Sequence, residues 1–146
     1  MSRTSRTNQV LYFARLNLDR VDEADSLQFK QMYEENALHH IYAGAVCLVS
    51  ELVDQYNLPS FKDLNELFAR NDLPSELIEL KLASSDSTSW LYNLIKQYER
   101  LILTGLHNNV NSGLISSQSD YGPLFRNYLI ELENFSERMR EHYQEN

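Results

Sequence analysis

The stretch from Ser26 to Tyr56 constrains the fold more than any other part of the chain, because it is long, free of proline and apolar at helical spacing. Residues 41–49 are apolar on nearly all sides, whereas the flanks are apolar on one side only. A helix with this profile is contacted from several directions at its middle, so the pattern predicts the central helix of a bundle. The recurring apolar positions, three and four residues apart, are Phe29, Tyr33, Ala37, Ile41, Ala45, Leu48, Leu52 and Tyr56.

The centre of this stretch is rich in small residues, namely Ala43, Gly44 and Ala45. Small side chains allow a neighbouring helix to approach closely, as expected inside a bundle. The apolar run is shorter than the roughly 20 residues that a membrane-spanning helix needs. We therefore expect no membrane span.

Composition bounds the class of protein. A chain of 146 residues is expected to form one domain. Its net charge of −8, from 21 acids against 13 bases, disfavours nucleic-acid binding, which usually requires a basic face. The one cysteine, Cys47, excludes an intramolecular disulfide and a cysteine-rich metal site. The first residues lack the apolar core of a secretory signal, which predicts a cytoplasmic location.

Capping residues divide the chain into helices. Proline is tolerated at a helix start, and serine or aspartate satisfies the free N–H groups of a first turn. We expect residues 1–7 to be a flexible tail and residues 8–146 to form a single helical domain, with residues 107–120 as a long loop. The expected helices span residues 8–24, 26–56, 60–69, 74–82, 87–106 and 120 to near the C-terminus.

This order predicts an all-α fold, an up-and-down bundle of four long helices with two short helices at one end. The first two long helices are joined by only a few residues, so they should be antiparallel neighbours.

Two polar constellations lie near the apolar faces. Asn36 and His40 are one helical turn apart, and Asn8 on the preceding helix is a candidate partner. Buried polar groups must be paired, so these residues predict a polar core network that either sets helix register or lines a small ligand pocket. The adjacent His39 and His40 point about 100° apart on a helix and do not form a metal-binding spacing. We expect neither a metal nor another cofactor.

Six residues separate Arg100 from His107. This spacing resembles the arginine–histidine ribonuclease motif of HEPN domains, which are also helical bundles. The residue after the arginine is the apolar Leu101, where those nucleases usually carry a polar one. The resemblance implies an RNA-cleaving enzyme that uses Arg100 and His107, which is the alternative functional hypothesis.

A second resemblance covers about the first sixty residues. The chain resembles a family of small helical gammaproteobacterial proteins of unknown function over two segments, Arg6 to Ala14 and Ala37 through Tyr56 to Pro59. The resemblance implies a bacterial cytoplasmic helical protein and supplies no catalytic residue to transfer.

The expected loop carries Leu114 and Ile115 among asparagines and serines, and Tyr121 follows it. These residues either cap the end of the bundle or form a partner surface near the last two helices, where tyrosine would supply contact area with a polar tip. The leading functional hypothesis is a non-enzymatic cytoplasmic interaction or regulatory protein that binds a protein partner or self-associates.

Overall fold

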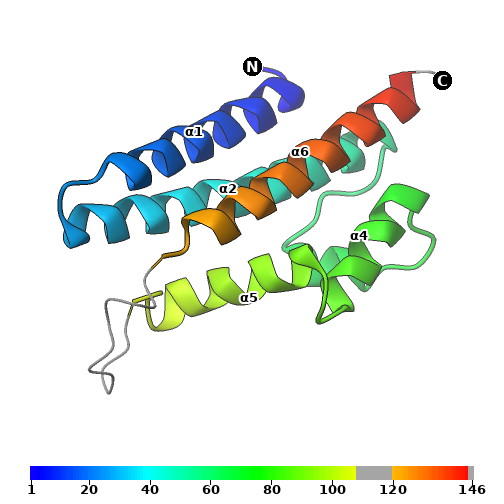
Figure 1. Cartoon of the computed structure of the whole chain (residues 1–146). Coiled ribbons are helices and arrows are strands. Elements are labelled where there is room, and N and C mark those ends of the chain that lie inside the picture. Colours follow the sequence, from blue (N-terminus) through cyan, green and yellow to red (C-terminus); the bar gives the residue numbers. More distant parts are fainter. Residues whose placement is uncertain (108–119, 145–146) are drawn as a thin grey trace.

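The computed structural model describes residues 1–107 and 120–144 (Figure 1). These residues form six α-helices and no strand, which confirms the predicted all-α class. The helices are α1 (Arg3–Glu23), α2 (Leu27–Gln55), α3 (Leu64–Phe68), α4 (Ser75–Ser85), α5 (Trp90–Leu103) and α6 (Gly122–Gln144).

The four long helices run alternately up and down. As predicted, α1 and α2 form an antiparallel pair with a short connection, and α6 lies against both of them (Figure 1). Helix α5 packs on α2 and α6, and α4 joins it at one end of the bundle. The α2 helix contacts α1, α4, α5 and α6. It is therefore the central helix that its apolar middle predicted.

The pairing of α1 with α2 depends on a close approach at Gly44. A Cβ atom added to Gly44 would lie 2.5 Å from Cδ2 of Leu11, so a larger residue here would force the Leu11 side chain to shift. Gly44 and Ala45 are both buried. The small residues at the centre of α2 thus allow the close approach of a neighbouring helix that the sequence predicted.

The start of α1 differs from the prediction for residues 1–7. The helix begins at Arg3, and Thr7 is fully buried. Polar contacts hold this turn in place, since Thr4 Oγ1 donates a hydrogen bond of 2.9 Å to the Glu51 carboxylate on α2. The turn is anchored by hydroxyl and charged groups, so it lacks the apolar stripe by which the sequence reveals a packed helix.

The later helices begin and end within a few residues of their predicted bounds. Helix α3 is shorter than predicted because Asp63, and not Ser60, is its N-cap. Helix α5 ends at Leu103, and Gly105 follows with a φ of 84°. Its N–H donates to the Arg100 carbonyl at 2.9 Å, so the glycine closes the helix in the left-handed conformation that it adopts readily.

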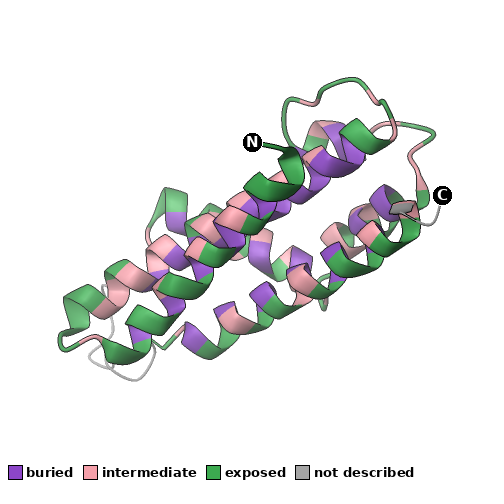
Figure 2. Cartoon of the chain, turned by 90° about the horizontal axis from the view of Figure 1, so that it is seen from above, coloured by how far each residue is buried: buried purple, intermediate pink, exposed green. Residues whose placement is uncertain are grey.

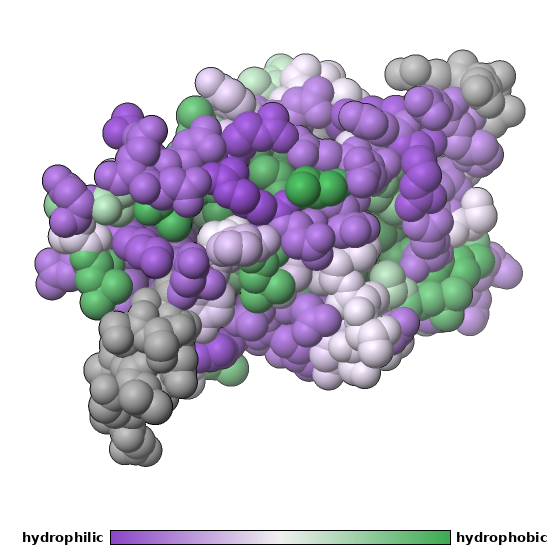
Figure 3. Space-filling model, in the orientation of Figure 1, coloured by the Kyte–Doolittle hydropathy of each residue, from purple (hydrophilic) through white to green (hydrophobic). Residues whose placement is uncertain are grey.

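The helices bury their facing sides and expose their outer sides (Figure 2). In the view of Figure 3 the surface is mostly hydrophilic, with small separate apolar patches. Phe29 departs from the predicted buried stripe of α2, since it is 52% exposed. None of the described helices has both the length and the apolar character needed to cross a membrane.

Candidate functional site

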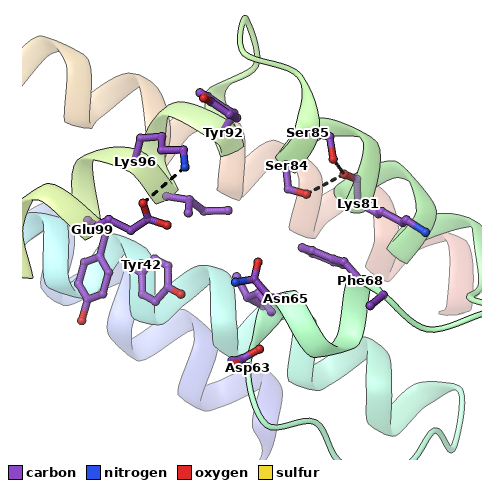
Figure 4. Close-up of a pocket in the computed structure, with 14 residues that line it drawn as sticks. Tyr42, Asp63, Asn65, Phe68, Lys81, Ser84, Ser85, Tyr92, Lys96 and Glu99 are labelled. Carbon is purple, nitrogen blue, oxygen red and sulfur yellow. Dashed lines mark hydrogen bonds and ion pairs between the residues drawn. The ribbon is translucent and has the colours of Figure 1, made fainter.

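A groove of about 440 Å³ lies where α3 and the α4–α5 unit meet the middle of α2 (Figure 4). Volumes of about 300–1,000 Å³ are typical of ligand-binding sites. Aromatic and aliphatic side chains from three helices form much of its lining, namely Tyr42, Phe68, Tyr92, Ile95 and Tyr98.

Hydrogen bonds at both ends fix the position of the short helix α3. Asp63 caps its first turn by accepting a bond of 2.8 Å from the Glu66 N–H. Arg70, just beyond the helix, donates to the Glu66 carboxylate at 2.7 Å and to two backbone carbonyls of the preceding connection. The closed set of bonds holds Asn65 and Phe68 at the groove, where Figure 4 shows them on the α3 side.

The α4–α5 turn is rich in serine for a structural reason. The Ser84 and Ser85 hydroxyls donate to the Lys81 carbonyl at 2.7 and 3.3 Å, which satisfies the last turn of α4. Ser89 caps α5 by accepting from the Tyr92 N–H at 3.1 Å. These caps turn the chain sharply and place Tyr92 at the groove (Figure 4).

Two stacked tyrosines form one wall of the groove. The rings of Tyr42 on α2 and Tyr98 on α5 are 3.9 Å apart between centroids and inclined by 3°. His39 adds an edge-on contact to Tyr98 at 5.5 Å. Burial raises the pKa of Tyr42, and neighbouring Tyr98, Asp63 and Glu99 raise it further. The Tyr42 hydroxyl therefore stays protonated at neutral pH and can donate a hydrogen bond.

The hydroxyls of Tyr42, Tyr92 and Tyr98 have no hydrogen-bond partner among the described residues. The nearby charges are balanced, since Lys96 Nζ lies 3.5 Å from the Glu99 carboxylate and 5.4 Å from the centre of the Tyr92 ring. A site of this kind offers flat apolar contact together with hydrogen-bonding groups.

The charged side chains that line the groove are Asp63, Lys81, Lys96 and Glu99. No histidine or cysteine is among its described lining residues. Over residues 1–107 and 120–144, no cluster of three or more histidine, cysteine, aspartate or glutamate side chains could hold a metal ion.

The structure brings together two of the three residues of the predicted polar network. His40 Nδ1 lies 2.8 Å from the backbone carbonyl of Asn36, and the His40 ring meets Phe13 edge-on at 5.6 Å. Asn8 is instead exposed, and its side-chain oxygen accepts a bond of 3.0 Å from Arg140 on α6. The contact between Asn36 and His40 lies within one helix, and Asn8 belongs to a different cluster.

Arg100 lies near the end of α5 and His107 just beyond it, and the imidazole faces Glu34. Arg100 Nη2 donates to the Leu106 carbonyl at 3.0 Å. His107 Nε2 lies 3.2 Å from Oε1 of Glu34, and the His107 side chain is 9% exposed. Burial lowers the pKa of His107, and the charges of Arg100 and Lys30 lower it further.

The predicted partner surface is described only in part. Leu114 and Ile115 lie outside the described residues. Tyr121 is half-buried, and its hydroxyl donates to the Leu106 carbonyl at 3.1 Å. Cys47 is partly buried, and burial raises the pKa of its thiol, which disfavours the reactive thiolate.

Three buried carboxylates, Glu34, Glu51 and Glu76, were not singled out from the sequence. Glu76 accepts a bond from the Tyr56 hydroxyl, and His142 Nδ1 lies 3.1 Å from the same carboxylate. For Glu34 and Glu51 the sequence did carry a signal, namely their spacing from apolar residues of α2. Glu34 is seven residues before Ile41, and Glu51 is seven residues after Gly44, which places both on buried faces of α2.

Comparison with known proteins adds a family and no activity. No protein of curated function matches the chain, and neither does any solved structure. The model of one family, described as a family of unknown function, DUF6586, matches residues 1–146. This confirms the resemblance to a family of unknown function, and no HEPN family is matched. The chain therefore belongs to DUF6586.

Proposed function

We propose that this protein acts without catalysis of its own, by binding a short segment of a partner protein in the groove between α2, α3, α4 and α5. The supporting observation is the stacked pair Tyr42 and Tyr98, whose hydroxyls have no hydrogen-bond partner among the described residues. Tyrosines of this kind are enriched at protein interfaces because they combine a large rigid contact area with a polar tip.

The polar groups of the groove suit a peptide better than an anionic ligand. Lys96 is already close to Glu99, so the groove presents no uncompensated cluster of positive charge for phosphates. The amide of Asn65 and the tyrosine hydroxyls can both donate and accept, as the alternating N–H and C=O groups of a peptide backbone require. The net charge of −8 also disfavours a nucleic-acid partner.

The geometry at His107 favours this proposal over RNA cleavage by Arg100 and His107. A general acid or base must reach the proton of its substrate within hydrogen-bond distance. His107 Nε2 instead faces the fully buried Glu34 carboxylate. An incubation of the purified protein with single-stranded RNA tests the alternative directly, and we expect no cleavage above that of His107→Gln.

The proposal includes a cytoplasmic location in a bacterium, with which the acidic net charge of −8 is compatible. The partner is a different protein or a second copy of this chain. Both fit a groove that binds a segment, and the mass of a covalent adduct distinguishes them.

Position-specific cross-linking tests the proposal in living cells. A photo-cross-linking amino acid is placed at Asn65 or Glu99 in the groove, and at Gln28 at the far end of α2 as the control. We expect one adduct of the same mass from both groove positions and none from Gln28. Equal adducts at all three positions, or none at the groove, would contradict the proposal.

A matched pair of substitutions on α5 tests whether the cross-linked adduct depends on the groove. Ile95 lines the groove, whereas Leu103 is 80% exposed at the end of the same helix. Ile95→Glu should abolish the adduct by placing a charge in the groove, and Leu103→Glu should leave it unchanged. Circular dichroism of both variants establishes that they are folded. Persistence of the adduct in Ile95→Glu would exclude the groove as the binding site.

A further inference from the structure

Glu34 is a fully buried acid at the end of the bundle opposite α3 and α4. One carboxylate oxygen, Oε2, accepts a hydrogen bond of 2.7 Å from the backbone N–H of Tyr121. The other, Oε1, lies 3.2 Å from Nε2 of His107. Both Oε1 and Nε2 are buried, and neither has any other hydrogen-bond partner among the described residues. The two atoms can satisfy one another only if a proton lies between them.

This contact joins three helices at one point. His107 follows the end of α5, Tyr121 precedes α6, and Glu34 is on α2. The Tyr121 ring meets the His107 ring edge-on at 5.3 Å, and its hydroxyl reaches the Leu106 carbonyl at 3.1 Å. Loss of the contact between Glu34 and His107 would therefore loosen both the exit of α5 and the entry of α6.

Charged groups of both signs surround the pair. Lys30 and Glu35 on α2 influence it electrostatically, as do Arg100 on α5 and Asp120 before α6. Lys30 Nζ lies 3.8 Å from the Asp120 carboxylate, so these two charges largely offset one another.

At the same end, Arg126 of α6 pairs with Asp19 and Asp22 of α1. With the surrounding charges offset in this way, burial governs the pair. Burial raises the pKa of Glu34 to about 7 against the opposing effects of the Tyr121 N–H and Lys30. Burial also lowers the pKa of His107.

We infer that Glu34 and His107 share a single proton in the folded protein, and that folding transfers this proton from the imidazole to the carboxyl group. In the unfolded chain at mildly acidic pH the carboxyl is ionised and the imidazole is protonated. In the folded chain one proton occupies the space between Oε1 and Nε2, and the buried pair carries no net charge. The number of bound protons is the same on both sides, so none is exchanged with solvent.

The two partners oppose one another in their effect on pH dependence. The pKa of Glu34 is raised from 4.5 to about 7, so its contribution to stability is lost as pH rises through that window. The pKa of His107 is lowered from 6.5, so its contribution is lost as pH falls below that value. Where these two pH windows overlap, the opposite changes of stability with pH cancel. The pair thus buffers this end of the bundle against moderate changes in pH.

Four proteins test the inference by urea-induced unfolding between about pH 5 and pH 7. They are the wild type, Glu34→Gln, His107→Gln and the double variant, which supplies the background of all other titrating groups. Relative to that background, the unfolding constant of His107→Gln should increase as pH rises, by up to about tenfold per pH unit. That of Glu34→Gln should increase as pH falls, and the wild type should follow the double variant within about threefold.

Opposite slopes in the two single variants are the signature of the shared proton. If either single variant runs parallel to the double variant, the inference is overturned. Glu35→Gln, which removes the neighbouring carboxylate of α2, is the control and should retain the wild-type profile.

An NMR titration of the wild type tests the same point without any substitution. The Tyr121 amide donates to Glu34, so its chemical shift reports the ionisation of that carboxyl. We expect this shift and the His107 ring signals to change together near neutral pH, as a coupled pair requires. A Tyr121 shift that changes near pH 4, the ordinary range of a glutamate, would overturn the inference even if every variant failed to fold.

Discussion

Glu34 and Glu51 are both buried on α2, yet their pKa values move in opposite directions. Burial raises the pKa of Glu34 to about 7. Burial alone would also raise the pKa of Glu51, but hydrogen bonds led by that of Arg140 outweigh it and the net pKa is lowered. The difference lies in the partner, because a guanidinium is always charged whereas an imidazole can give up its proton.

The two ends of the bundle are therefore stabilised by different kinds of interaction. At the Glu51 end, Arg140 of α6 donates to both carboxylate oxygens at 3.2 and 2.8 Å, and Thr4 of α1 adds a bond of 2.9 Å. This is a permanent ion pair that joins α1, α2 and α6. At the Glu34 end the contact is uncharged when protonated. A buried acid alone thus does not indicate how a helix end responds to pH.

Removal of the guanidinium should have the largest effect. Arg140→Met leaves Glu51 buried without its counter-charge, which we expect to lower the free energy of unfolding by about 3–5 kcal/mol. Arg138→Met is the control on the same helix, because its pair with Glu79 is exposed and worth about 0–1 kcal/mol. Urea denaturation at neutral pH measures both. A loss in Arg140→Met as small as the loss in Arg138→Met would show that the ion pair does not hold this end.

Neutralising each acid should sharpen the comparison. Glu51→Gln loses charge-assisted hydrogen bonds, which we expect to cost about 2–3 kcal/mol of unfolding free energy at neutral pH. Glu34→Gln keeps an acceptor for the Tyr121 N–H and buries no charge, so it should change stability by about 1 kcal/mol or less. Thermal and urea unfolding of the two variants side by side provide the measurement. Equal costs would mean that the ends are held alike.

Acid should separate the ends by sign. The lowered pKa of Glu51 means that its contribution is fully present above the unfolded value of 4.5 and is lost as pH falls below it. Unfolding midpoints measured from about pH 5 to pH 3 should therefore fall more steeply for the wild type than for Glu51→Gln. Glu34→Gln should not show this protection, because the raised pKa of Glu34 makes its own contribution to stability grow, and not shrink, as pH falls through the unfolded value of 4.5. Parallel acid profiles for the wild type and Glu51→Gln would refute the assignment.

The sequence predicted the helices far better than these contacts. The spacing of Ile41, Leu48 and Leu52 identified α2 as the central helix, because apolar burial has a period that can be read directly. The first turn of α1 was missed because Thr4 and Thr7 pack through polar contacts, which leave no such period. Phe29 was predicted to be buried because periodicity reveals a face and not whether another helix covers it.

The candidate groove could not have been predicted for a related reason. Tyr42 and Tyr98 are far apart in sequence, and Tyr42 is one of many residues in the apolar run 41–49. Their stacking depends on the rotation of α5 against α2, which is set by packing and not by local pattern. The spacing of Arg100 and His107 was visible, but the inward orientation of the imidazole depends on Glu34 of a distant helix.

The smallest predicted effect distinguishes a structural tyrosine from a groove tyrosine. The Tyr143 hydroxyl donates to the Glu51 carboxylate at 3.1 Å, so Tyr143→Phe removes one bond from the cluster that holds the Glu51 end. We expect a loss of about 0.5–1.5 kcal/mol in unfolding free energy. Tyr92→Phe removes a hydroxyl that has no partner among the described residues, so its unfolding free energy should change by about 0.5 kcal/mol or less. The same Tyr92→Phe should weaken the cross-link formed from the groove, whereas Tyr143→Phe should not. A stability loss in Tyr92→Phe that matched Tyr143→Phe would assign the Tyr92 hydroxyl to the fold and not to a binding role.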